Sequence, residues 1–291
     1  MDITKFKVKE IYKEDKNYPK PLLDLLDPPK KLYYIGVLHN IDWNSALAIV
    51  GSRHMTQYGR QVLERFVPDL VSKRVVIVSG FMYGVDTQAH SLTIEMGGQT
   101  VAVLANGLDV CYPPENQNLY EKVLKNKGLL ISEYPMGRKP HLWTYPRRNR
   151  IVAALSLLGT LVVEAGENSG SLITAKLANK LKRKVYAVPG PITSNVSFGT
   201  NKLIKNRQAK ICLDTAQIVE SEQLINLQTT KPELNGLEAK IYQILLRENL
   251  TLDEICLALE SDISQTSTTL SLMTLSGLVE EIAGKYYCTS K

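Results

Sequence analysis

Three short segments of the 291-residue chain combine glycine with side chains that can bind an anion. They are Gly51-Ser52-Arg53, the stretch holding Ser79, Gly80 and Gly84, and Ser169-Gly170-Ser171. Each follows an apolar run and precedes a helical pattern, so a ligand can approach the backbone and meet helix-start N–H groups and hydroxyls. Arginine adds a rigid pair of donors suited to phosphate. One such segment is a weak signal, but three predict a row of anion sites, which suits a nucleic-acid backbone.

The segment 133–150 adds aromatic and basic side chains to this set. Its basic residues are Arg138, Lys139, Arg147, Arg148 and Arg150, and its aromatic residues include Trp143 and Tyr145. Cations interleaved with aromatic rings are typical of a platform for single-stranded nucleic acid, on which bases stack while phosphates are neutralised. We interpret the segment as a long loop, with at least one of the two rings serving as a half-buried anchor of that loop.

Asp86 and His90 lie one helical turn apart after the second glycine segment. We expect Asp86 to cap the N-terminus of a helix and to hold His90 through a hydrogen bond. A paired acid and base, or a cluster of metal ligands, is missing from the sequence around these loops. The four cysteines are widely spaced and form no CxxC pair, so they are interpreted as reduced packing residues. We therefore predict a binding protein without catalysis, cofactor or metal.

The elements that position these loops follow from the hydrophobic pattern. Six apolar runs typical of buried strands alternate with helical spacing, and they cover 47–50, 75–79, 100–104, 129–132, 160–164 and 185–189. Such alternation predicts an α/β fold of the extended Rossmann type, with a doubly wound, mostly parallel sheet. Ligands of these sheets bind at the carboxyl ends of the strands, where the glycine loops fall.

The predicted organisation has four parts. Residues 1–40 form a proline-containing lead-in that packs on the core, and 41–220 form the Rossmann-like domain. A linker covers 221–235, and residues 236–291 form a small domain. In this last part, three helical stretches (236–247, 251–259 and 263–276) precede a hairpin around 283–284, which is a winged-helix pattern.

The charge is divided unevenly between these parts. The chain carries a net charge of +6, with +10 over residues 1–224 and −4 over 225–291. A basic domain points to a polyanionic partner. The candidate recognition helix, 263–277, holds no Lys or Arg, so we expect the small domain to contact protein and not DNA.

Other classes are disfavoured by the sequence. No apolar stretch is long enough to cross a membrane, and the charged N-terminus lacks the pattern of a signal peptide, so cytoplasm is the expected location. The GxGxxG fingerprint of a dehydrogenase is missing after Val50, which argues against NAD. The alternative that remains is a nucleotide phosphoribohydrolase of the Lonely Guy type, because Gly159-Thr160 and Glu164 partly match its motif, although its Pro-Gly-Gly is missing.

These motifs together resemble the DNA-processing protein A (DprA/Smf) family. The matching segments are IVGSR (49–53), SGFMYGVDTQAH (79–90), GLDVCYP (107–113), ISEYP (131–135), YPRRNRIVAALS (145–156), VVEAGENSGSLITAKLA (162–178) and VYAVPGPITSNVSFGTNKLI (185–204). The resemblance implies an extended Rossmann fold, homodimers and binding of single-stranded DNA without a catalytic step. It also implies that the DNA is handed to a RecA-type recombinase during natural transformation.

The resemblance also implies roles for individual residues. Gly51, Ser52 and Arg53 match the phosphate-contacting motif, Arg148-Asn149-Arg150 match a second basic motif, and Trp143 or Tyr145 matches the base-stacking aromatic residue. Three features depart from the family pattern. Phe81-Met82 replaces Leu-Ala, Pro114 replaces a DNA-binding lysine, and Leu142 replaces a basic residue. We expect Arg138, Lys139 or Arg147 to compensate for the last two.

Overall fold

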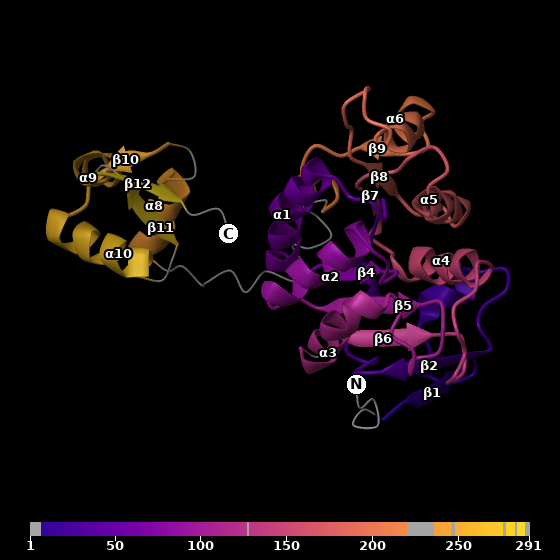
Figure 1. Cartoon of the computed structure of the whole chain (residues 1–291). Coiled ribbons are helices and arrows are strands. Elements are labelled where there is room, and N and C mark those ends of the chain that lie inside the picture. Colours follow the sequence, from indigo (N-terminus) through magenta and orange to yellow (C-terminus); the bar gives the residue numbers. More distant parts are fainter. Residues whose placement is uncertain are drawn as a thin grey trace. The chain divides into compact units, whose positions relative to one another are not determined.

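The computed structural model describes residues 7–126, 128–219, 236–245, 248–275, 278–282 and 284–288 (Figure 1). The chain divides into two compact units, Met1–Leu224 and Ile225–Lys291. The predicted linker, 221–235, lies outside the described residues. The domain boundaries proposed from the sequence stay predictions.

A nine-stranded sheet forms the centre of the first unit, in the order β1-β2-β6-β5-β4-β3-β7-β8-β9. Its strands are β1 (Lys9–Tyr12), β2 (Lys31–Ile35), β3 (Ala46–Val50), β4 (Val76–Ser79), β5 (Thr100–Leu104), β6 (Leu129–Ser132), β7 (Gly159–Val162), β8 (Val185–Ala187) and β9 (Lys210–Ile211). The seven neighbouring strands β6, β5, β4, β3, β7, β8 and β9 pair in parallel. At one edge of the sheet, β2 pairs antiparallel with β6, and β1 pairs antiparallel with β2. All six strands predicted from apolar runs are present, which confirms the α/β fold class.

Helices cover both faces of this sheet. They are α1 (Gln57–Ser72), α2 (Val85–Glu95), α3 (Gln117–Lys125), α4 (Thr144–Leu155), α5 (Gly170–Lys180) and α6 (Phe198–Lys205), with short 3₁₀ turns at Lys20–Asp24, Trp43–Ser45, Pro114–Asn116 and Thr215–Gln217. Side chains alternate along β3, so Leu47 and Ile49 pack with α1 and α2, while Ala48 and Val50 pack with α4 and α5. Because both faces of the six strands β3 to β8 are buried, their sequences are mainly apolar, which is why the sequence predicted them.

The N-terminal segment differs from the predicted lead-in, because it contributes β1 and β2 to the sheet. Ile11, Leu32 and Ile35 are buried in the core, while the other positions of the two strands are partly or fully exposed. Strands at the edge of a sheet can face water on one side, so their sequence lacks the continuous apolar run of a central strand.

The second unit has a small core of its own. Its elements are α8 (Leu237–Leu245), α9 (Leu252–Leu259), α10 (Ile263–Leu275), β10 (Leu250–Thr251), β11 (Val279–Ile282) and β12 (Lys285–Cys288). Ile241, Ile255 and Leu270 are buried between the three helices. Thr251 and Glu254 cap α9 reciprocally, which fixes where that helix begins. The three helices and the antiparallel pair β11–β12 confirm the predicted winged-helix pattern.

Candidate nucleic-acid interface

A cleft of about 530 Å³ opens at the carboxyl ends of β3, β4 and β7. Its walls come from the loops after these strands and from the first turns of α4 and α5. The lining residues include Gly51, Ser52, Arg53, Gly80, Asp86, Tyr145, Arg148, Asn149, Ser169, Gly170 and Ser171, together with Leu142, Asn168 and Ile173. The fold therefore brings together residues from all three glycine segments and from the basic segment 133–150.

The loop after β3 is held close to the start of α2. A side chain at Gly51 would begin 2.5 Å from Val85, and one at Gly84, whose φ is +72°, would meet the Ser52 carbonyl. These contacts explain why both positions are glycine. Ser52 accepts a hydrogen bond from the His54 N–H at 3.1 Å and is nearly buried. Gly84 thus shapes the loop and does not line the cleft.

Arg53 is exposed at the cleft and lies over the ring of Tyr145, 5.2 Å from the ring centroid. Tyr112 packs against the same ring at 6.4 Å. Tyr145 is therefore a support for Arg53, through a cation–π contact, as well as a candidate for base stacking. Burial raises the pKa of Tyr145 to about 12, so its hydroxyl stays protonated beside the guanidinium.

Trp143 precedes α4 and is 52% exposed. Arg138 lies over its ring at 5.3 Å, and the ring of His141 is parallel to it at 6.3 Å. Leu142, the residue that replaces a basic one, is 90% exposed and lines the cleft. Base stacking by Trp143 or Tyr145 stays a prediction, and so do supporting roles for Arg138 and for Lys139, which is exposed outside the cleft lining.

Two predictions about the second glycine segment are wrong. Ser79 is fully buried and donates its hydroxyl proton to the Ile49 carbonyl at 2.6 Å, so it cannot reach a phosphate. Asp86 is not the cap of α2, because Gly84 occupies that position. Asp86 instead lies in the first helical turn and accepts a hydrogen bond from the Met82 N–H at 3.3 Å. Its carboxylate thus holds the 80–84 loop from inside.

The predicted hydrogen bond between Asp86 and His90 is also wrong. His90 is fully buried, and its Nδ1 atom lies 2.7 Å from the Thr100 hydroxyl. Its Nε2 atom is buried without a hydrogen-bond partner. Burial, together with the nearby charge of Arg148, lowers the pKa of His90 to about 3. The imidazole is therefore neutral at neutral pH and belongs to the core.

Arg148 has a different role from the predicted phosphate contact. The residue is 4% exposed, and its guanidinium lies against Gly80 at the base of the cleft. It donates to the carbonyls of Gly80 and Val103, and its Nε atom donates to Asn149 at 3.1 Å. Burial lowers the pKa of Arg148 to about 10, while the neighbouring Asp86 carboxylate raises it, so the charge persists at pH 7. We assign Arg148 to the support of the strand-end loops.

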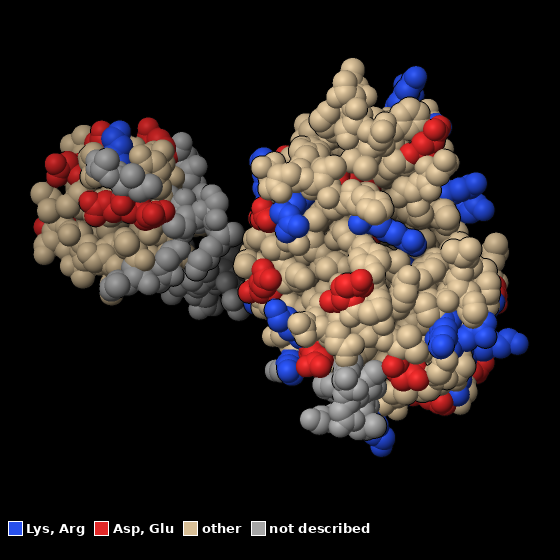
Figure 2. Space-filling view, viewed as in Figure 1, with Lys and Arg blue, Asp and Glu red and all other residues tan. Residues whose placement is uncertain are grey.

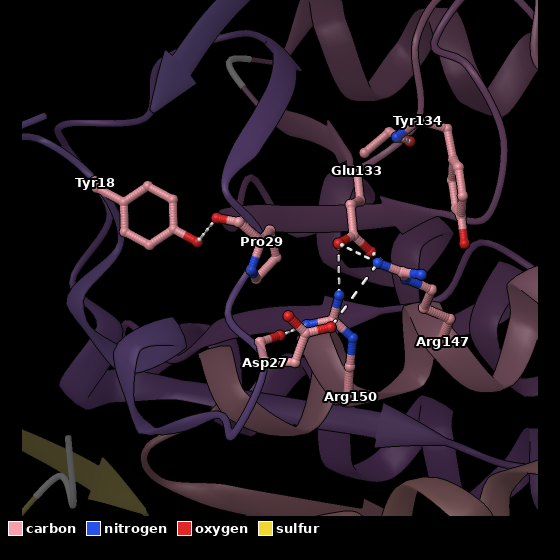
Figure 3. A network of polar contacts seen from close by, with 8 residues as sticks. Tyr18, Asp27, Pro29, Glu133, Tyr134, Arg147 and Arg150 are labelled. Atoms are coloured by element: carbon pink, nitrogen blue, oxygen red, sulfur yellow. Dashed lines mark hydrogen bonds and ion pairs between the residues drawn. The ribbon is translucent and has the colours of Figure 1, made fainter. Parts of the chain in front are cut away.

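Two neighbouring arginines, Arg147 and Arg150, do not line the cleft. Arg147 and Arg150 both bind Glu133, with N–O distances of 3.1 and 2.6 Å (Figure 3). Arg150 also donates to the Asp27 carbonyl at 2.6 Å. The two residues therefore fasten α4 to the loop after β6, and Arg150 also fastens it to the N-terminal segment. Arg150 does not line the cleft, and its contact with phosphate stays a prediction. The segment is also helical from Thr144, so the predicted loop ends at Trp143.

The third glycine segment forms the start of α5. Ser169 is the N-cap of this helix and accepts a hydrogen bond from the Ser171 N–H at 3.4 Å. Asn149 donates its side-chain amide to the Gly170 carbonyl at 3.3 Å, which joins α4 to this turn. The positive end of the helix dipole and the serine hydroxyls make this turn suited to an anion.

Glu164, the acidic residue of the phosphoribohydrolase alternative, is 1% exposed. Its two oxygens accept the N–H of Thr56 at 2.9 Å and the Thr56 hydroxyl at 2.5 Å. The carboxylate thus holds the turn at the start of α1, a role that its position after a strand did not reveal. Within the described residues no group of His, Cys, Asp and Glu could hold a metal ion.

The two units differ in surface charge (Figure 2). Acidic side chains gather on the visible face of the second unit, while Lys and Arg are spread over several parts of the first. Among the helices that the structure describes, none is both long and apolar enough to span a bilayer.

Comparison with known proteins places these features in a family. A family model for DNA recombination-mediator protein A matches residues 9–223. Protein Smf of Synechocystis is 39% identical over 211 residues, which are 72% of this chain but only 52% of that protein, so the chain spans about half of the relative's length.

Two solved structures are similar to the chain as well. DNA processing protein A of Streptococcus pneumoniae has a TM-score of 0.67 and 36% identity, covering 74% of each chain. DNA processing protein A of Helicobacter pylori, described with a single-stranded DNA binding mode, has a TM-score of 0.65 and 30% identity, covering 76% of this chain and 97% of that one. These matches confirm the resemblance found in the motifs, and the chain belongs to the family of DNA recombination-mediator protein A.

Proposed function

We propose that this protein binds single-stranded DNA in the cleft at the carboxyl ends of β3, β4 and β7. The observation that carries the proposal is the meeting of Arg53, the capped start of α5 and the loop at Gly80 around one cavity of about 530 Å³. Arginine and helix-start N–H groups are suited to phosphates, and the aromatic and apolar groups at Tyr145 and Leu142 are suited to bases. The relative from Helicobacter pylori binds single-stranded DNA, as its description states.

We further propose that the protein acts in the cytoplasm as a homodimer, holding the strand and passing it to a RecA-type recombinase without any reaction of its own. The family's name, a recombination mediator, supports this role. Support for a role without chemistry comes from Glu164, whose carboxylate is buried and engaged by Thr56. If the protein were a phosphoribohydrolase, it would release base from a nucleoside monophosphate, and Glu164→Gln would abolish that release.

The experiment is a salt-dependent titration with single- and double-stranded oligonucleotides. We expect tighter binding of the single strand, and we expect Arg53→Ala to weaken binding to all sequences alike. The plot of log K against log salt has a negative slope, and loss of one phosphate contact makes that slope shallower by about 0.7. Arg65→Ala is the matched control, because Arg65 is exposed on α1 outside the cleft lining. If Arg53→Ala and Arg65→Ala bound the single strand with equal affinity, Arg53 would not contact the DNA.

A further inference from the structure

A second groove lies between α5 and α6, two helices that neighbour each other at the β8–β9 side of the sheet (Figure 1). Its volume is about 620 Å³, and Leu172 and Leu203 contribute apolar surface to it. Its basic lining residues are Lys176, Lys180, Lys202 and Arg207, and its one acidic lining residue is Glu167. The groove therefore concentrates positive charge beyond the cleft described above.

Among the residues that the structure describes, most of this charge has no acidic partner. Lys202 lies 3.6 Å from Glu167, but both side chains are more than half exposed, so this pair contributes little. Lys176, Lys180 and Arg207 take part in none of the ion pairs found among the described residues. Like charges gathered along one groove repel one another, and a polyanion relieves that repulsion.

The groove begins where the cleft ends, because α5 separates the two. Ser171 and Thr174 face the cleft, whereas Leu172, Lys176 and Lys180 follow one another at intervals of four residues and face the groove. The turn before α5 is shared in the same way. Asn168 lines the cleft and its neighbour Glu167 lines the groove. A chain of phosphates leaving the cleft at this turn thus meets the basic groove directly.

We propose that the α5–α6 groove binds the continuation of the DNA strand held in the cleft, through its phosphates. The inference rests on the proposed function of the cleft. The only ring that the groove's basic residues contact, among the described residues, is Phe198, which lies under Lys202 at 5.5 Å. The groove therefore binds the backbone of any sequence and extends the site, so that longer strands gain affinity that short strands lack.

The test compares oligonucleotides of about 6 and about 20 nucleotides, lengths that bracket the site sizes of about 4 to 16 nucleotides known for single-strand-binding folds. The variant is the full chain with Lys176→Gln and Lys180→Gln, two exposed residues outside the cleft lining. We expect its affinity for the long strand to fall on the order of tenfold at about 0.1 M salt. The negative slope of log K against log salt should become shallower by about 1.4, because two phosphate contacts are lost. Affinity for the short strand stays unchanged.

The matched control is Lys122→Gln with Lys125→Gln, which removes the same charge from α3 on the other face of the sheet. It should leave both affinities unchanged. An equal loss of affinity for the short and the long strand overturns the groove proposal. No loss of affinity for either strand overturns it as well, and that result is expected if a protein partner occupies the groove. Failure of the proposed function looks different, because the unsubstituted protein would then bind neither oligonucleotide and Arg53→Ala would change nothing.

Discussion

The two units of this chain differ most in where they place polar groups. In the first unit, Asp86, Arg148 and Glu164 are buried close to the carboxyl ends of the parallel strands. In the described part of the second unit, the buried side chains are apolar except for Thr266. Burying a charge is costly unless it is paired or hydrogen-bonded, and Asp86, Arg148 and Glu164 all hydrogen-bond to the loops or turns that follow the strand ends.

Among the substitutions proposed here, Arg148→Ala should lower the stability of the first unit most. The change leaves the carbonyls of Gly80 and Val103 without their donor and removes the charge beside Asp86. We expect a loss of about 3 kcal/mol in the free energy of unfolding of the first unit. Urea denaturation measures it, with Arg65→Ala as the control. If the variant had unchanged stability but no longer bound DNA, Arg148 would instead be a direct phosphate contact.

Acid should destabilise the first unit selectively, because His90 is buried in its neutral form. Its pKa is about 3 in the folded protein against 6.5 for the free side chain, so the unfolded chain binds the proton first. Stability is then fully present above pH 6.5 and is lost as the pH falls below it, by on the order of a few kcal/mol near pH 4.

His90→Asn keeps a polar atom near Thr100 and removes the titrating ring, so it should flatten this part of the pH dependence. Unfolding free energies between pH 7 and about pH 4 measure the difference. The same slope in the variant and the parent protein would assign the acid sensitivity to other groups.

Substitutions at the two aromatic residues sharpen the account of the cleft. Tyr145→Ala removes the ring under Arg53 and should cost about 1–3 kcal/mol of binding free energy, whereas Tyr145→Phe keeps the ring and should cost almost nothing. Trp143→Ala should cost a similar amount if Trp143 stacks on a base. Normal binding by both alanine variants, with tryptophan emission that ignores added DNA, would refute stacking in this loop.

The basic motif also shows what sequence can and cannot reveal. Arg147, Arg148 and Arg150 look equivalent when they are read as a loop. On a helix, residues three apart share a face, so Arg147 and Arg150 turn together toward Glu133 while Arg148 turns under the cleft. Pro146 lies in the first turn of α4, a position where a helix tolerates proline.

The fold was more predictable than the site. Strands buried on both faces carry continuous apolar runs, and glycine at a strand end signals a close approach, as Gly51 shows against Val85. Contacts between distant segments leave no such local signal. The partners of His90 and Glu164 lie on other elements, at Thr100 and Thr56, so they became clear only in three dimensions.

Removal of the second unit should have the smallest effect on DNA binding. Its candidate recognition helix, α10, carries no Lys or Arg, and the antiparallel pair has Glu280 and Glu281 against Lys285. We expect a chain truncated after about Gln228 to keep its affinity for single-stranded DNA within about tenfold, or 1.4 kcal/mol. A larger loss, with the truncated protein still folded, would show that this unit contributes to DNA binding.

The central claim is that the cleft of the first unit is the DNA site, and amide hydrogen exchange of the full chain with and without a single-stranded oligonucleotide tests it most directly. Exchange reports local opening along the chain, so a bound strand slows it where it holds the backbone. We predict slower exchange at residues 51–56 and 168–174 and unchanged exchange over 237–275. Protection confined to 237–275, with the cleft loops unaffected, would contradict this account.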